Sequence, residues 1–166
     1  NIIIEDISIS LIASSGPDST IIDGNVSGSV IKVDSEEDVL IHGFTIQNGI
    51  GELLDGSRFG GGILSHNSIL TLDSLIVKNN EAFAGGGICF YNMEVSEVHP
   101  VVANSLIENN IASEGGGIFV VNQYLTVMES TINNNGMVPY GSGGGIQALV
   151  SNISLLDVML TNNHSR

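Results

Sequence analysis

The chain has few aromatic residues and few cations. Aromatic residues make up 5% of its 166 residues, and tryptophan is absent. The four basic residues are Lys32, Arg58, Lys78 and Arg166, against 18 acidic residues, so the formal net charge is −14. A surface of this charge repels phosphate backbones and anionic lipid, so we expect no nucleic-acid partner. Cys89 is the only cysteine. It can form no internal disulfide, and we expect a buried free thiol.

Long apolar runs are also lacking. No run approaches the roughly 18 residues that a membrane-spanning helix needs, so we expect no membrane insertion by this segment. The apolar stretch at residues 1–16 is interrupted by Glu5 and Asp6 and has no basic start, which favours a strand over a signal peptide. Ile, Val and Leu supply most of the 42% hydrophobic content, and Gly, Asn and Ser are abundant. This composition predicts an all-β chain.

A repeated motif organises what is present. The tetrapeptide Gly-Gly-Gly-Ile begins at Gly60, Gly85, Gly115 and Gly143. An apolar-x-Asn-Asn landmark follows each copy, with 19 residues from the first glycine to the first asparagine in three copies. The offset is 24 in the second copy, because "YNMEVSEVHPV" holds an insertion. The landmark also occurs earlier as "IIDG" and "IQNG", which makes six copies spaced by 25 to 31 residues.

Aligning the six copies produces columns of like residues. The first column is apolar: Ile21, Ile46, Val77, Ile107, Ile132 and Leu160. The second column lies two residues on: Asp23, Asn48, Asn79, Asn109, Asn134 and Asn162. We predict that it forms a structural ladder, in which side-chain amides bond neighbouring repeats. The third column is Gly24, Gly49, Asn80, Asn110, Asn135 and Asn163. Gly and Asn tolerate a left-handed backbone best, so we predict positive φ in this third column.

Each repeat contains three short strands. Between the landmarks, "ILTL", "YLTV" and "ISLL" alternate apolar and polar residues, as half-buried strands do. Strands with no helix between them, at this period, suit a coil that wraps once and stacks on the next. A leucine-rich repeat would show a helical return, and a propeller needs repeats of about 40 residues. We therefore predict a parallel β-helix of about six coils. Residues 1–166 would form a single segment, a fragment of a longer solenoid.

The motif pair also resembles a known family. "GGGI" followed by "S-x-I-x-N-N", and the opening "STIIDGN…DVLIHGFTIQNG", are similar to right-handed parallel β-helix repeats of the polymorphic outer-membrane protein type, within the pectin-lyase-like fold. Isoleucine stands here where that family's Phe-x-x-Asn element has phenylalanine. The resemblance implies a secreted or cell-surface protein that acts in adhesion or as a rigid stalk.

Ligand-binding candidates lie in the connections between repeats. Glu52, Asp55 and Arg58 share the longest connection, residues 49–59, and could form a catalytic or ligand-binding group. Residues 92–100 and 135–142 are the other connections where recognition is expected, and the latter carries Tyr140. No catalytic residue is assigned, because the scattered histidines and single Asp of the columns do not form the paired carboxylates of a glycosidase.

No cofactor is required by the sequence, and Ca²⁺ is the one that it could accommodate. The acidic run at 34–38 offers oxygen ligands from Asp34, Glu36, Glu37 and Asp38. No other metal site is predicted. Asn25, Asn152 and Asn163 begin N-glycosylation acceptor sequences.

Three functions fit these features. The first is a non-enzymatic extracellular β-helix that acts as a stalk, an adhesin or a surface-assembly unit. The second is a carbohydrate-binding or polysaccharide-degrading β-helix, a lyase or hydrolase, with its active site partly outside this segment. The third is a filament unit that self-associates through open coil ends. A carbohydrate or a host cell surface would be the partner in the first two cases.

Overall fold

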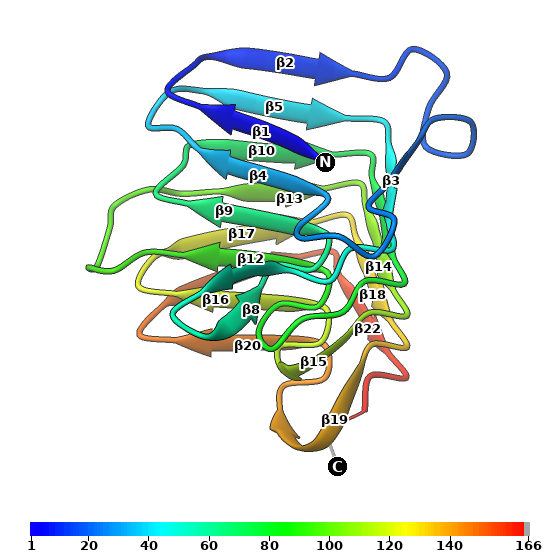
Figure 1. Ribbon diagram of the computed structural model, residues 1–166, viewed down its shortest axis with the longest axis vertical. Helices are drawn as coiled ribbons and strands as arrows, with labels where there is room; N and C mark the ends of the chain where they lie inside the picture. The colour runs from blue at the N-terminus through cyan, green and yellow to red at the C-terminus, as the bar shows by residue number, and fades with distance from the viewer. Residues whose placement is uncertain (165–166) are drawn as a thin grey trace.

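The computed structural model describes residues 1–164, without the side chains of residues 137–140. All regular elements in this part of the chain are strands, and the chain winds them into a stack of coils with the two termini at opposite ends (Figure 1). Three parallel sheets of six strands run along the stack. This confirms the predicted parallel β-helix with three strands per coil.

The sheets take one strand from each coil in turn. Sheet A contains β1 (Ile2–Glu5), β4 (Ile31–Asp34), β9 (Ile63–His66), β12 (Ile88–Tyr91), β16 (Ile118–Val121) and β20 (Ile146–Leu149). Sheet B contains β2 (Ile9–Ile12), β5 (Val39–His42), β10 (Leu70–Asp73), β13 (Val101–Ala103), β17 (Tyr124–Met128) and β21 (Asn152–Leu156). Sheet C contains β3 (Ile21–Asp23), β6 (Thr45–Gln47), β11 (Ile76–Lys78), β14 (Leu106–Glu108), β18 (Thr131–Asn133) and β22 (Met159–Thr161). Six stacked strands are separated by five steps, so the solenoid makes about five turns rather than the predicted six coils.

Apolar ladders fill the inside of the stack. Leu70, Leu72, Leu125 and Val127 of sheet B are buried, as the alternation predicted, whereas the Thr71 side chain between the first two is half-buried on the outer face. In the apolar column of sheet C, the four inner members are fully buried, whereas Ile21 and Leu160 of the terminal coils are exposed. Each coil therefore buries an apolar face that a single coil would leave exposed.

The first repeat is shifted by one residue against the predicted alignment. Ile22, not Ile21, pairs with Ile46, and Asp23 pairs with Gln47 rather than with Asn48. Ile21 is accordingly 55% exposed.

The glycine triplets mark the corner between sheets C and A, and each position has its own requirement. The first glycine has positive φ, for example +65° at Gly85. The second and third leave no room for a side chain, because a Cβ at Gly86 would lie 2.5 Å from the Ile111 carbonyl oxygen. A Cβ at Gly87 would lie 2.6 Å from the oxygen of Gly117 in the next coil. Neighbouring coils thus pack backbone to backbone here, as the sequence predicted.

The two asparagine columns exchange their predicted roles. Positive φ occurs in the second column, at Asn48, Asn79, Asn109, Asn134 and Asn162, and Asp23 is not among these residues. The buried ladder runs instead through the third column: Asn80, Asn110, Asn135 and Asn163. Each step joins Nδ2 of one asparagine to Oδ1 of the next at 3.0 Å. The predicted φ assignment is therefore wrong by one position.

The predicted ladder residues make side-chain bonds at the exposed edge of the same corner. Asn48 Nδ2 donates to Asp23 Oδ2 at 2.8 Å, and Asn134 Nδ2 donates to Asn109 Oδ1 at 2.5 Å. Asn162 donates to Asn133 instead of to a member of its own column. The second column thus holds an interrupted outer set of bonds beside the continuous inner ladder.

Serine hydroxyls bridge coils at the other two corners. Between sheets B and C, the Leu75 N–H donates to Ser105 Oγ, and the Ser105 N–H donates to Ser130 Oγ. Between sheets A and B, the Ser35 N–H donates to Ser68 Oγ at 3.0 Å. These bonds satisfy backbone groups where the strands stop pairing.

A second, smaller apolar cluster lies on the outer face of sheet A. Leu64, Cys89 and Phe119 project outward and are buried together with Ala84. The hairpin of β7 (Glu52–Leu54) and β8 (Ser57–Phe59) lies over part of this cluster, and its Leu54 and Phe59 side chains pack on it. The strands β15 (Ile111–Glu114) and β19 (Gly136–Ser142) pair beside it. Burial raises the pKa of the Cys89 thiol, so the predicted buried free thiol is confirmed and is unreactive near neutral pH.

Candidate functional site

The predicted group in the connection 49–59 does not come together. This connection is the β7–β8 hairpin, in which Leu53 faces Arg58 across the pair. The Arg58 guanidinium donates to the Gly51 carbonyl oxygen at 2.8 Å, so it fixes the hairpin's own backbone. Glu52 belongs to the neighbouring cross-strand pair, so its side chain lies on the opposite face of the hairpin from Arg58, with a carboxylate oxygen near Gly28. Asp55 sits at the tip with positive φ and an exposed side chain. For the other candidate, Tyr140, the side chain lies outside the described residues.

A row of chemically active side chains runs along the outer face of sheet A. Asp34, His66 and Tyr91 occupy successive strands in register. His66 Nδ1 lies 3.0 Å from Asp34 Oδ1, and the imidazole stacks on the Tyr91 ring with the centroids 5.9 Å apart. This row could not be predicted from the sequence, because its members stand at the ends of strands 25 to 32 residues apart.

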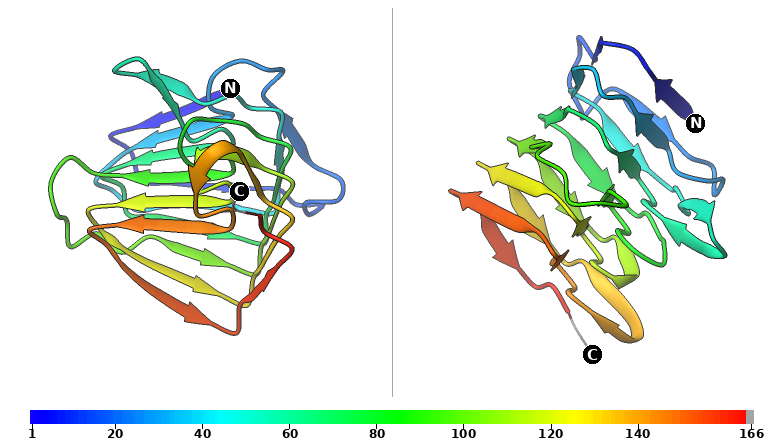
Figure 2. Two further views of the ribbon diagram at one scale, coloured as in Figure 1. Left: turned by 90° about the horizontal axis from the view of Figure 1, so that it is seen from below. Right: turned by 90° about the vertical axis from the view of Figure 1, so that its left-hand side faces the viewer.

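The insertion at residues 92–100 forms a loop that projects from the corner between sheets A and B (Figure 1 and Figure 2). Asn122 of the next coil holds its first part, since Asn122 Nδ2 donates to the Asn92 carbonyl oxygen at 2.9 Å. The Ser96 N–H donates back to the Asn122 carbonyl oxygen at 2.8 Å. His99 anchors the far end by stacking on Tyr124 with the ring centroids 4.4 Å apart.

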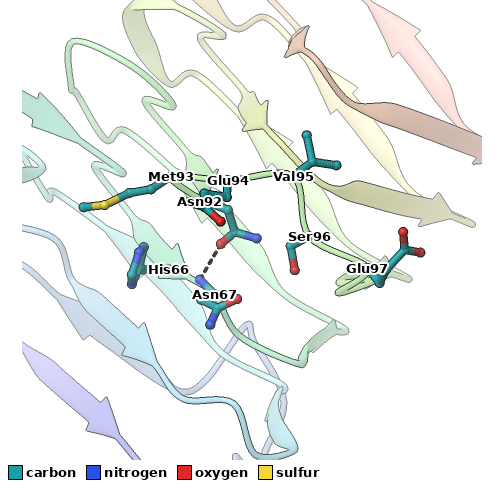
Figure 3. A pocket seen from close by; sticks show the side chains of 8 residues that line it. All are labelled: His66, Asn67, Asn92, Met93, Glu94, Val95, Ser96 and Glu97. Carbon is teal, nitrogen blue, oxygen red and sulfur yellow. Dashed lines mark hydrogen bonds between the residues drawn. The ribbon is translucent and has the colours of Figure 1, made fainter.

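A cavity of about 510 Å³ lies between this loop and the end of β9. Its lining combines two side chains from the coil with a run from the loop: His66, Asn67, Asn92, Met93, Glu94, Val95, Ser96 and Glu97 (Figure 3). Asn92 lies in the middle of these residues in Figure 3, with its oxygen turned toward Asn67. The lining carries carboxylates and amides and has no lysine or arginine.

The Asn92 side chain is buried and only half satisfied. Its Oδ1 accepts a hydrogen bond from the Asn67 N–H at 2.6 Å, whereas its Nδ2 has no partner among the described residues. Gln123, on the adjacent coil, likewise has a buried Nε2 without a hydrogen-bond partner among the described residues. Unpaired buried donors are rare in folded proteins, and each is a sign that an acceptor is missing.

A second cavity of about 350 Å³ adjoins the first at His66 and Asn67. Its other lining residues are all acidic: Asp6, Asp34, Glu36 and Glu37. Glu36 Oε1 accepts from Asn67 Nδ2 at 3.0 Å. We call the two cavities together the acidic groove.

The acidic run predicted as a Ca²⁺ site is divided by the fold. Asp34, Glu36 and Glu37 line the acidic groove, but Asp38 lines a different hollow on sheet B. Within residues 1–164, no three His, Cys, Asp or Glu side chains are arranged to hold a metal ion. The acidic groove is therefore a polar cavity without a preformed cation cage.

A second histidine–aspartate pair lies on sheet B. His42 Nδ1 is 2.8 Å from Asp73 Oδ2, and Asn104 Nδ2 donates to Asp73 Oδ1 at 2.8 Å. Burial tends to raise the pKa of Asp73, but the bonds from Asn104 and His42 outweigh it and lower that pKa. Together with the His66–Asp34 pair, this pair joins the second and third coils on two faces.

Neither known protein families, nor curated proteins, nor solved structures show a match to this chain. In the part of the chain that the structure describes, no helix could cross a membrane.

Proposed function

We propose that this chain is a non-enzymatic module of a secreted or cell-surface protein that acts as a stalk, an adhesin or a surface-assembly unit. The observation that carries the proposal is the continuous stacking of coils. Ladders of Asn80, Asn110, Asn135 and Asn163, together with the apolar columns, link successive coils without a break. Such a stack transmits force along its axis through many parallel bonds, which suits a stiff spacer.

The chemistry of the outer surface also supports a structural role. The Arg58 guanidinium donates a hydrogen bond to the backbone of its own hairpin, and Lys32 Nζ lies 3.2 Å from Glu5 Oε1. Neither cation therefore faces a carboxylate cluster in the way that a polysaccharide lyase of this fold would require. The resemblance to polymorphic outer-membrane protein repeats points in the same direction.

The stalk role is tested by pulling single molecules of the chain between flanking marker domains. A stiff solenoid should resist force and then unfold coil by coil, with extension steps that match the repeat of 25 to 31 residues. The adhesin role is tested by displaying the chain on a non-adherent bacterium and measuring attachment to cultured cells. Cleavage of uronic-acid polymers by the purified chain would contradict both roles.

A polysaccharide-binding or polysaccharide-degrading function is the second candidate. The row of Asp34, His66 and Tyr91 favours it, because it offers a carboxyl group, an imidazole base and an aromatic face along one sheet. His66→Ala and Tyr91→Ala variants would then lose polysaccharide binding in affinity electrophoresis. Equal migration of the wild type in gels with and without polysaccharide would exclude this candidate.

A further inference from the structure

The acidic groove has one sign of charge along its whole length. Its carboxylates come from three segments far apart in sequence: Asp6, Asp34, Glu36, Glu37, Glu94 and Glu97. No lysine or arginine lines either cavity, and the whole chain carries a net charge of −14. A groove lined by one sign of charge concentrates ligands of the opposite sign. The occupant that this field favours is cationic.

The Asn92 amide adds an independent requirement. The side chain is 2% exposed, and its Nδ2 has no acceptor among the described residues. Turning the amide over would not help, because Oδ1 would then leave the Asn67 N–H at 2.6 Å. A buried donor without a partner destabilises the fold, so an occupant that supplies an acceptor oxygen removes this cost.

These two requirements together select one class of ligand. A metal ion or a polyamine matches the charge but provides no acceptor for Asn92. A neutral sugar provides acceptors but gains nothing from the field. A peptide rich in lysine or arginine provides both, since its backbone carbonyls accept and its side chains are cationic.

We propose that the acidic groove binds a lysine- or arginine-rich peptide segment of a partner protein, with a backbone carbonyl of that segment accepting a hydrogen bond from Asn92 Nδ2. In the free protein Nδ2 is closed to solvent, so this bond requires the loop to move when the segment binds. Met93 and Val95 of that loop are 75% and 67% exposed and add little packing, so the movement must loosen mainly the bonds between Asn122 and the loop. The proposal names a partner class for the adhesion role, and it rests on that role for its biological setting.

The test uses a fluorescein-labelled lysine–serine repeat peptide and the purified chain in a fluorescence-anisotropy titration. We expect saturable binding that weakens as salt is added, because exposed charges are screened. The Glu94→Gln/Glu97→Gln variant should bind about tenfold more weakly. The matched control is Asp18→Asn/Asp157→Asn, which removes the same charge at exposed positions outside the groove and should change affinity by less than about twofold.

Two results would overturn the proposal. If both double variants weaken binding equally, the peptide follows net charge and not the groove. If the side-chain amide resonance of Asn92 does not shift when the peptide saturates the protein, Asn92 supplies no bond to it. Retained peptide binding without cell attachment would count against the adhesion role alone, whereas attachment without peptide binding would count against the groove alone.

Discussion

Replacing Asn110 by alanine tests whether the buried asparagine ladder holds the coils together. Asn110 is fully buried in the middle of the ladder. Its Nδ2 donates to the Val77 carbonyl oxygen at 2.9 Å and to Asn135 Oδ1 at 3.0 Å. Its Oδ1 accepts from both the backbone N–H and the Nδ2 of Asn80, at 3.1 and 3.0 Å. The substitution therefore removes four hydrogen bonds that cross three coils.

The expected loss of stability follows from what remains bonded. Asn80 Nδ2 keeps its bond to the Ile46 carbonyl oxygen, and Asn135 Oδ1 still accepts from the backbone N–H at position 110. The Asn80 N–H is left without its acceptor, and the Val77 carbonyl loses a donor. At about 1–3 kcal/mol for each such buried group, Asn110→Ala should lower the free energy of unfolding by about 2–6 kcal/mol. That is a large part of the total for a domain of this size.

Urea unfolding followed by circular dichroism measures this loss, with Asn109→Gly as the matched control. Asn109 is the neighbour with φ of +55°, which glycine adopts freely, and its side chain makes an exposed bond to Asn134. The control should cost about 1 kcal/mol or less. If Asn109→Gly destabilises the protein as much as Asn110→Ala does, the outer column carries the ladder energy and the reasoning is refuted.

Three further predictions address the glycine corner, the charged groups and the coil ends. Gly86→Ala would place a Cβ within 2.6 Å of two backbone carbonyl oxygens, whereas a Cβ at Gly136 would have open space. In urea unfolding we therefore expect Gly86→Ala to lower the free energy of unfolding by about 3 kcal/mol, and Gly136→Ala to change it little. Because the folded protein lowers the pKa of Asp73, the ionised carboxylate stabilises the fold above the ordinary pKa of 3.8. This stabilisation is lost as the pH falls through the lower pKa of the folded state. Asp73→Asn should therefore flatten the acid side of a plot of unfolding free energy against pH. Leu155 is 43% exposed on the last coil. If the coil ends self-associate, Leu155→Lys should reduce the molecular mass measured by light scattering at high protein concentration. An unchanged mass would argue against stacking through this face.

The period and the glycine corners could be predicted because each has a single physical cause. Three glycines in a row are costly unless one needs positive φ and the others must lie against backbone, and no other arrangement explains their recurrence. The apolar columns likewise require a face that neighbouring coils bury. Both features are local in sequence and repeat, so the chain supplies its own alignment.

The roles of the two asparagine columns could not be separated by the same reasoning. Asparagine tolerates the left-handed region and can also bond across coils, so propensity alone does not tell Asn79 from Asn80. The structure decides by position, because the residue after the turn points inward and its neighbour points out. The serine bridges were partly predictable, since Ser105 and Ser130 both stand at the serine position of the repeated motif "S-x-I-x-N-N".

The acidic groove was predictable only in outline. The insertion length singled out residues 92–100, and the acidic run singled out 34–38, but nothing in the sequence places one against the other. They lie on either side of His66 and Asn67, and this arrangement depends on the register that sets His66 beside Asp34. The unpaired Asn92 donor is a property of packing, which no pattern of residue types reveals.

The third column shows why a repeat pattern should not be extended by consensus. Asparagine fills it in four coils, so consensus would favour Gly49→Asn as a stabilising change. A Cβ at Gly49, however, would lie 1.9 Å from the Gly61 carbonyl oxygen and 2.7 Å from a methyl of the buried Val30. We therefore expect Gly49→Asn to destabilise the protein by about 3 kcal/mol, because the backbone of the next coil must move. Urea unfolding checks this, and a variant more stable than the wild type would mean that space does not decide between glycine and asparagine in this column.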